Sequence, residues 1–204
     1  MGWFARSVPW RSPRYWALDL ETSGVDPRRA EILSVGMVPI REGRIHWGDR
    51  FYRPVRPRRA SVGSADTVAA HALTGTELRG AEGLESVLPH VLQRLRDAVL
   101  LVHHVRLDVA FIKAAVDLSG YEMPALLVVD TVPLIERYNR RGVWLGREHR
   151  PVPLALGAAR RYFGLPDHSA HNALADALAT AELMLCLRAK LGCSTLRDLG
   201  ARRR

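Results

Sequence analysis

The stretch YWALDLETSG, residues 15–24, organises the rest of the chain. It is an apolar run that carries two acids, Asp19 and Glu21, and ends at a Ser-Gly pair. Residues two apart in a β-strand point to the same face, so the pattern predicts a strand with both carboxylates on one face and Leu18 and Leu20 on the other. Buried side by side, the carboxylates would repel each other and lose hydration, costs that a bound Mg²⁺ or Mn²⁺ removes. An edge strand with two solvated acids is the alternative, and the rest of the chain has to decide between them.

The composition favours one globular domain with a polyanionic partner. A chain of 204 residues, 48% hydrophobic and 25% charged, has room for a sizeable core. Its net charge is +9 and its pI about 10.5, which favours nucleic acid above other partners. Arginine dominates the basic residues, and a guanidinium suits bidentate contact with phosphate. The two cysteines, Cys186 and Cys193, provide neither a disulfide framework nor a C-x-x-C zinc motif.

The sequence gives no indication of a membrane partner. No uninterrupted apolar run is long enough to span a bilayer, and the arginines near the N-terminus are not followed by the apolar core of a signal peptide. We therefore expect a cytoplasmic protein.

The hydrophobic periodicity predicts an α/β fold with a mixed sheet. Three strands at 15–21, 31–40 and 45–52, the last two joined by a turn at Glu42-Gly43, form an antiparallel meander. Later strands separated by helices add parallel crossovers, and helices flank the sheet. The further strands are expected at 98–103 and 126–130, and the helices at 66–72, 84–96, 107–118, 132–138, 154–163 and 172–191. We expect loops at 53–59 and 139–150, an irregular arm at 1–14, a single domain at 15–199 and a basic tail at 200–204.

Two more acids occupy comparable places in this layout. Asp108 opens the helix after the fourth strand, and Asp176 lies in the first turns of the last long helix, five residues after His171. Taken singly, each is an ordinary acid near a helix start, where the helix dipole favours it.

Taken together, these motifs resemble the DEDDh exonucleases, the DnaQ-like family. The resemblance rests on D-x-E at 19–21, on Asp108, and on the H-x-x-x-x-D spacing from His171 to Asp176. Three further sequence segments add to the resemblance. They are Asp-Leu-Glu-Thr-Ser-Gly at 19–24, HALT at 71–74 and Asp-Thr at 130–131. The resemblance covers about residues 15–190, nearly the whole chain.

The resemblance implies an RNase H-like fold and a 3′→5′ exonuclease that releases nucleoside 5′-monophosphates. Carried over residue by residue, Asp19, Glu21, Asp108 and Asp176 hold two Mg²⁺ (or Mn²⁺) ions, and His171 is the general base. This agrees with the chemistry, because carboxylates suit these cations and a neutral imidazole accepts a proton from the attacking water. The implied substrates are 3′ ends of single-stranded DNA or RNA, and a DNA polymerase or repair protein is a candidate partner.

The expected substrate contacts come from two loops and one position at which this chain departs from the family. Thr22 and Ser23, together with His71 and Thr74, are expected beside the terminal nucleotide, although each could equally be a turn or cap residue. His104 stands where the family commonly has Asn, and it is expected to contact substrate at a different reach.

Three further residues of these segments either differ from the family pattern or compete for a role in the site. Leu107 replaces a usual Phe, which removes an aromatic surface. His168 lacks the spacing to Asp176, so we expect it in a surface loop, and His103 is expected to be a strand-end histidine outside the site.

Two other functions remain open at this point. A DnaQ-like module that binds nucleic acid or a partner without turnover would not need all five catalytic positions. A basic protein that merely coats nucleic acid would bind in a salt-sensitive way and yield no metal-dependent product.

Overall fold

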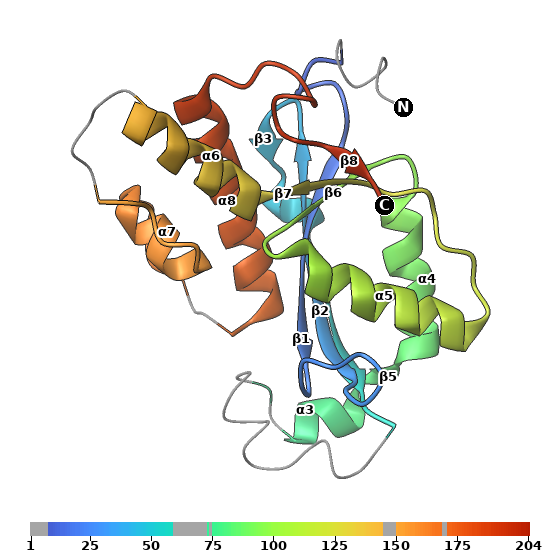
Figure 1. Ribbon diagram of the computed structural model, residues 1–204. Coiled ribbons are helices and arrows are strands. Elements are labelled where there is room, and N and C mark those ends of the chain that lie inside the picture. Colours follow the sequence, from blue (N-terminus) through green and yellow to red (C-terminus); the bar gives the residue numbers. More distant parts are fainter. Residues whose placement is uncertain (1–7, 59–72, 74, 145–149, 169–170) are drawn as a thin grey trace.

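A computed structural model describes residues 8–58, 73, 75–144, 150–168 and 171–204, and in it a β-sheet lies between two helical layers (Figure 1). The strands are β1 (Tyr15–Thr22), β2 (Ile32–Arg41), β3 (Arg44–Ile45), β4 (Phe51–Arg56), β5 (Glu82–Gly83), β6 (Val99–Val102), β7 (Leu127–Asp130) and β8 (Arg202–Arg203). The helices are α3 (Gly75–Gly80), α4 (Leu84–Leu95), α5 (Val105–Ser119), α6 (Thr131–Trp144), α7 (Leu156–Tyr162) and α8 (Ala173–Leu191), with a 3-10 turn, η1, at Trp47–Asp49.

The sheet is mixed, as the sequence predicts. Its strand order is β5-β4-β2-β1-β6-β7-β8, with β3 paired to β2. Strands β1, β2 and β4 pair antiparallel, whereas β1, β6 and β7 pair parallel. In Figure 1, α4 and α5 lie on one side of the sheet, and α6, α7 and α8 lie on the other.

The alternation within β1 decides which helices face the two acids. Trp16, Leu18 and Leu20 belong to the core that includes α4 and α5, whereas Tyr15 and Ala17 belong to the core that includes α6 and α8. Because the side-chain period of a strand is two, Asp19 and Glu21 continue the face on which α8 packs. The predicted orientation of this strand is therefore confirmed.

The third predicted strand is wrong in its bounds. Only Arg44–Ile45 pairs directly after the turn, and η1 interrupts the segment. Pairing resumes at β4, which begins inside the predicted strand and continues into the expected loop at 53–59. Phe51 and Val55 are buried on β4, so their burial overrides the proline content that suggested a loop. Pro54 fits there because β5 covers only Val55 and Arg56 of this strand.

Several segments near the helical and terminal regions also differ from expectation. Helix α6 runs to Trp144, so residues 139–144 are helical rather than a loop, and α3 was not predicted. The expected helix at 66–72 lies outside the described residues. The expected tail is instead an edge strand, in which Arg202 and Arg203 pair with β7. The arm packs in part, with Trp10 buried and Pro9 bridging to Thr195.

Candidate metal centre

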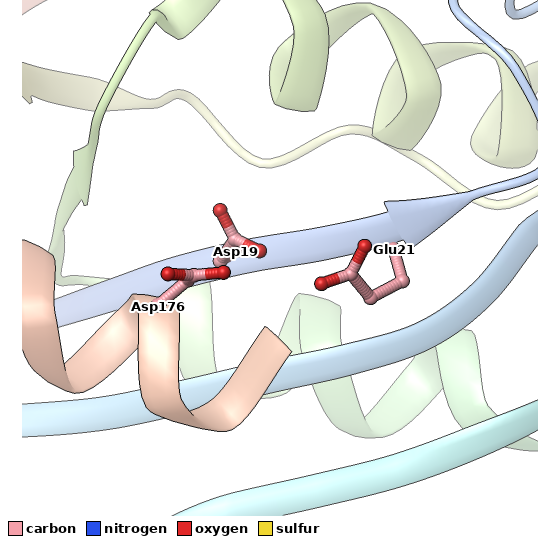
Figure 2. Close-up of side chains that lie close together, drawn as sticks. All are labelled: Asp19, Glu21 and Asp176. Atoms are coloured by element: carbon pink, nitrogen blue, oxygen red, sulfur yellow. The ribbon is translucent and has the colours of Figure 1, made fainter. Parts of the chain in front are cut away.

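Three carboxylates from two elements meet on the α8 side of the sheet. Figure 2 shows Asp19 and Glu21 on β1 and Asp176 on α8, with their carboxylates turned toward one another. One oxygen from each lies within 4.8 Å of the other two. The sequence predicted these three residues for one site, and the structure brings them together.

Asp176 reaches β1 because α8 lies unusually close to the sheet. Gly36 of β2 is the strand partner of Asp19, and a Cβ on Gly36 would lie 2.2 Å from the carbonyl carbon and oxygen of Ala173. Only a bare Cα therefore allows the first turn of α8 to rest at this point. Asn172 caps the helix, accepting N–H bonds from Leu174 and Ala175 at 3.1 Å. Sequence reasoning missed Gly36, although a glycine inside a strand is a known sign of close backbone approach.

Asp108 lies beside these three carboxylates but outside the group whose oxygens meet. It is buried in the first turn of α5, and the backbone amides of Leu20 and of Asp108 itself lower the pKa of its carboxyl against the effect of burial. Pairing between β1 and β6 stops at Ala17, which leaves Leu20 open to α5. The charge of Asp108 raises the pKa of Asp19, so the fourth predicted carboxylate belongs to the same electrostatic site.

Burial and mutual repulsion hold protons on this site when no cation is present. Burial raises the pKa of Asp19 well above its usual range, and Asp108, Asp176 and Glu21 raise it further. Burial raises the pKa of Glu21 to about 7, with Asp176 adding to the shift and His171 opposing it. Burial is also the main cause that raises the pKa of Asp108 to about 8. A divalent cation would relieve both costs, and these all-oxygen donors are the ligands that Mg²⁺ and Mn²⁺ prefer.

The two histidines of the preceding loop both contact Asp176, each through a different group. His168 Nε2 lies 2.7 Å from Asp176 Oδ1, and only about 13% of the His168 side chain is exposed. The expectation of a surface histidine is therefore wrong. His171 is exposed, with a left-handed backbone (φ 63°), and its backbone N–H donates to Asp176 Oδ2 at 2.9 Å. Its imidazole remains close enough to Glu21 to lower that carboxyl's pKa.

One further carboxylate, Asp130 at the end of β7, fixes where α5 begins. It accepts the backbone N–H groups of His104 at 3.2 Å, of Val105 at 3.0 Å and of Val132 at 2.9 Å. A single side chain thus caps the starts of α5 and α6, and α5 carries Asp108. The sequence pointed to Asp130 only through the Asp-Thr pair and assigned it no role.

The backbone of His104 explains which residues suit that position. Its φ is 69°, in the left-handed region, where Asn, Asp and His are several-fold enriched among non-glycine residues. Histidine and the asparagine usual in the family therefore meet the same conformational requirement. The His104 ring stands edge-on to that of His103, at a centroid distance of 4.8 Å. His103 is outside the site, as expected: its Nδ1 lies 2.6 Å from Thr131 Oγ1, and burial lowers its pKa to about 4.

Of the other residues predicted to contact substrate, two have hydroxyls that bond to nearby backbone groups, and two lie outside the described residues. Thr22 Oγ1 donates to the carbonyl of Gly24 at 2.7 Å, and Ser23 Oγ accepts from the N–H of Glu31 at 2.9 Å. Both hydroxyls therefore shape the turn after β1. His71 and Thr74 are outside the described residues.

Comparisons with known proteins agree on one family. The family model for exonucleases (RNase_T) matches residues 16–184. The chain is 29% identical over 170 residues to DNA polymerase III PolC-type of Clostridium perfringens, covering 83% of this chain and 11% of that protein. It is 25% identical over 122 residues to the 3′-5′ exonuclease DinG of Bacillus subtilis, covering 59% of this chain and 13% of that protein.

Solved structures share the fold. Exonuclease I of E. coli in complex with a dT13 oligonucleotide aligns with a TM-score of 0.74 at 16% identity, covering 88% of this chain and 42% of that one. The chain thus spans only about a tenth of the length of the curated relatives it matches. Within the described residues, no helix has the length and apolarity needed to cross a membrane.

Proposed function

The chain belongs to the exonuclease family, and on that premise we propose that it is a metal-dependent 3′→5′ exonuclease acting on single-stranded nucleic acid. The observation that carries the proposal is the meeting of Asp19, Glu21 and Asp176 within 4.8 Å, on the face of β1 that α8 covers. A binding module has no need for three carboxylates that repel one another at such close range.

The direction of hydrolysis and the substrate are supported by the relatives. DinG is named a 3′-5′ exonuclease, PolC is a DNA polymerase III, and Exonuclease I was solved with an oligonucleotide. We propose that residues 15–199 form the exonuclease domain, in agreement with the matched range of 16–184. A DNA polymerase or repair protein is a candidate partner, and the cytoplasm is the candidate compartment.

The four acids would hold two Mg²⁺ or Mn²⁺ ions. Asp19, Glu21 and Asp176 supply the converging oxygens, and Asp108 adds a buried carboxylate beside Asp19. Bound cations of this kind make a water more acidic and neutralise charge on the departing 3′-oxygen. They would also remove the repulsion that raises the pKa of Asp19.

The protein's own groups would position and deprotonate the attacking water. We assign His171 as general base because its imidazole is exposed and lies near Glu21, so it can take a proton at the edge of the carboxylate cluster. His168 instead holds Asp176 by its side chain and orients that ligand. The turn formed by Thr22 and Ser23, together with His104, would border the terminal nucleotide, and the product would be a nucleoside 5′-monophosphate.

The test is a product analysis on single-stranded DNA and RNA labelled at either end, in Mg²⁺, Mn²⁺ or EDTA. The proposal predicts that 5′-labelled strands shorten stepwise and that 3′-labelled strands release a labelled mononucleotide at once, in both metals and not in EDTA. Circular single-stranded DNA is the control for endonuclease activity and should persist. Binding without shortening would favour the module without turnover, and shortening from the 5′ end would contradict the proposed direction.

A further inference from the structure

A basic groove lies at the edge of the sheet formed by β7 and β8. Four arginines line it, namely Arg137, Arg140, Arg202 and Arg204, and its volume is about 210 Å³. We call it the arginine groove. Its wall also includes Val105, the first residue of α5, and Asp130.

The arginines differ in how far their charges are already engaged. Arg137 donates to the Asp198 carbonyl and to Cys193 Sγ, so it builds the wall. The Nη1 of Arg140 lies 3.9 Å from a Glu136 oxygen in a largely exposed pair, which is a weak restraint. Arg202 and Arg204 are exposed on or next to β8, and no ion pair joins either to another described residue.

The four arginines outnumber the one acidic side chain that lines the groove, Asp130, so the groove keeps a net positive charge. The Asp130 carboxylate accepts hydrogen bonds from three backbone N–H groups, those of His104, Val105 and Val132. The groove therefore presents guanidinium groups to any ligand, above a floor that includes Val128 and Leu199.

The groove also lies within reach of the carboxylate cluster. Strands β1, β6, β7 and β8 are successive neighbours, so β8 lies three strand spacings, about 14 Å, from β1. The strand register places Arg202 level with Trp16, and Asp19 lies three residues, about 10 Å, further along β1. A single strand whose 3′ end lies at Asp19 covers that distance within a few nucleotides. Asp130 and the start of α5 connect the two places, since Asp108 belongs to the first turn of α5.

We propose that the arginine groove binds the phosphodiester backbone of the substrate strand, a few nucleotides upstream of the 3′ end that is hydrolysed. This rests on the proposed function, because it assumes that the 3′ end enters the carboxylate cluster. Guanidinium groups match phosphate oxygens bidentately without reading the bases, so the contact is independent of sequence and sensitive to salt.

The test compares two double variants that remove equal charge. Arg202→Gln/Arg204→Gln changes the groove, and Arg44→Gln/Arg96→Gln removes two exposed arginines elsewhere as the matched control. Fluorescence anisotropy in EDTA measures the Kd of a single-stranded 20-mer over a range of salt concentrations. Hydrolysis is measured in Mg²⁺ on the same 20-mer, on a dinucleotide and on thymidine 5′-p-nitrophenyl phosphate.

The groove variant is expected to weaken 20-mer binding several-fold and to reduce the slope of log K against log salt by about 1.4, that is, 0.7 for each of two phosphate contacts. KM for the 20-mer rises accordingly, while turnover of the two short substrates stays at the wild-type rate. The control double variant should leave all of these near wild type. Arg140→Gln, on α6 rather than β8, should weaken 20-mer binding in the same direction and covers the case in which the β8 variant folds poorly.

If the two double variants weakened 20-mer binding equally, the proposed role of the groove would be wrong. It would also be wrong if neither Arg202→Gln/Arg204→Gln nor Arg140→Gln weakened binding. Failure of the proposed function looks different, because wild-type protein would then hydrolyse neither the 20-mer nor the short substrates. The anisotropy measurement does not depend on turnover and decides the groove in either case.

Discussion

Gly36 and Asp19 are cross-strand partners, and the first turn of α8 rests on Gly36 where a Cβ would lie 2.2 Å from Ala173. This contact sets the height of α8 above the sheet. It thereby sets the distance between Asp176 and the two acids of β1.

Gly36→Ala is expected to displace α8 and separate the carboxylates. The new methyl group meets backbone, which cannot rotate away, so we expect a loss of about 1–3 kcal/mol in the free energy of unfolding and at least a tenfold loss of nuclease activity. Chemical denaturation measures the free energy of unfolding, and hydrolysis of an oligonucleotide measures the nuclease activity. Gly48→Ala is the control, because a Cβ there meets nothing within 4 Å, and wild-type behaviour of Gly36→Ala would refute the account of α8.

Substitution of the two histidines near Asp176 should affect different kinetic parameters. His171→Ala is expected to lower kcat about 10²-fold or more at saturating Mg²⁺, the usual scale for loss of a general base. His168→Ala should change kcat far less but raise the Mg²⁺ concentration needed for half-maximal activity about tenfold or more, because it releases a metal ligand. Titrating Mg²⁺ for both variants separates these effects, and the reverse ranking of kcat would show that His168 is the base.

Asp130 is expected to hold α5, and with it Asp108, through backbone hydrogen bonds. Asp130→Ala leaves three N–H groups without this acceptor, so we expect a loss of about 1–2 kcal/mol in stability and faster hydrogen exchange at the amides of His104 and Val105. Asp130→Asn keeps one acceptor oxygen and should fall between. Asp117→Asn, at an exposed position late in the same helix, is the control. Unchanged exchange at both amides in Asp130→Ala would contradict the capping role.

The carboxylate cluster should make the metal-free protein less stable as pH rises. The pKa values of Glu21 and Asp108 are raised to about 7 and about 8 in the fold, above their ordinary values of 4.5 and 3.8. Folding therefore favours their protonated forms, and that contribution is complete below about pH 4 and is lost as pH rises toward 8.

Thermal unfolding from pH 4 to 8 in EDTA tests this against Asp108→Asn, which cannot ionise. The wild-type Tm should fall relative to that of the variant across this range, and Mg²⁺ should raise the wild-type Tm more at pH 8 than at pH 5. A constant difference between the two proteins would contradict the cluster's electrostatics.

What the sequence predicted well was local. The two-residue period of β1 placed Asp19 and Glu21 on one face, and helical patterning placed Asp176 in the first turn of a long helix. What it missed depends on distant parts of the chain meeting in space.

Gly36 looked like an ordinary strand residue until α8 was seen to lie on it. His168 appeared peripheral because spacing along the chain does not show that its ring turns back onto Asp176. Asp130 caps a helix that begins 25 residues earlier in the chain, a relationship that no local pattern contains.

The most direct test of the central claim is the rate of 3′-end hydrolysis by Asp19→Ala and Asp176→Ala, purified alongside wild type and checked for folding by thermal unfolding. Because each substitution removes one of the three carboxylates that meet within 4.8 Å, the account predicts loss of nearly all turnover in both while the fold persists. Near wild-type hydrolysis by both folded variants, with contaminating nuclease excluded, would contradict it.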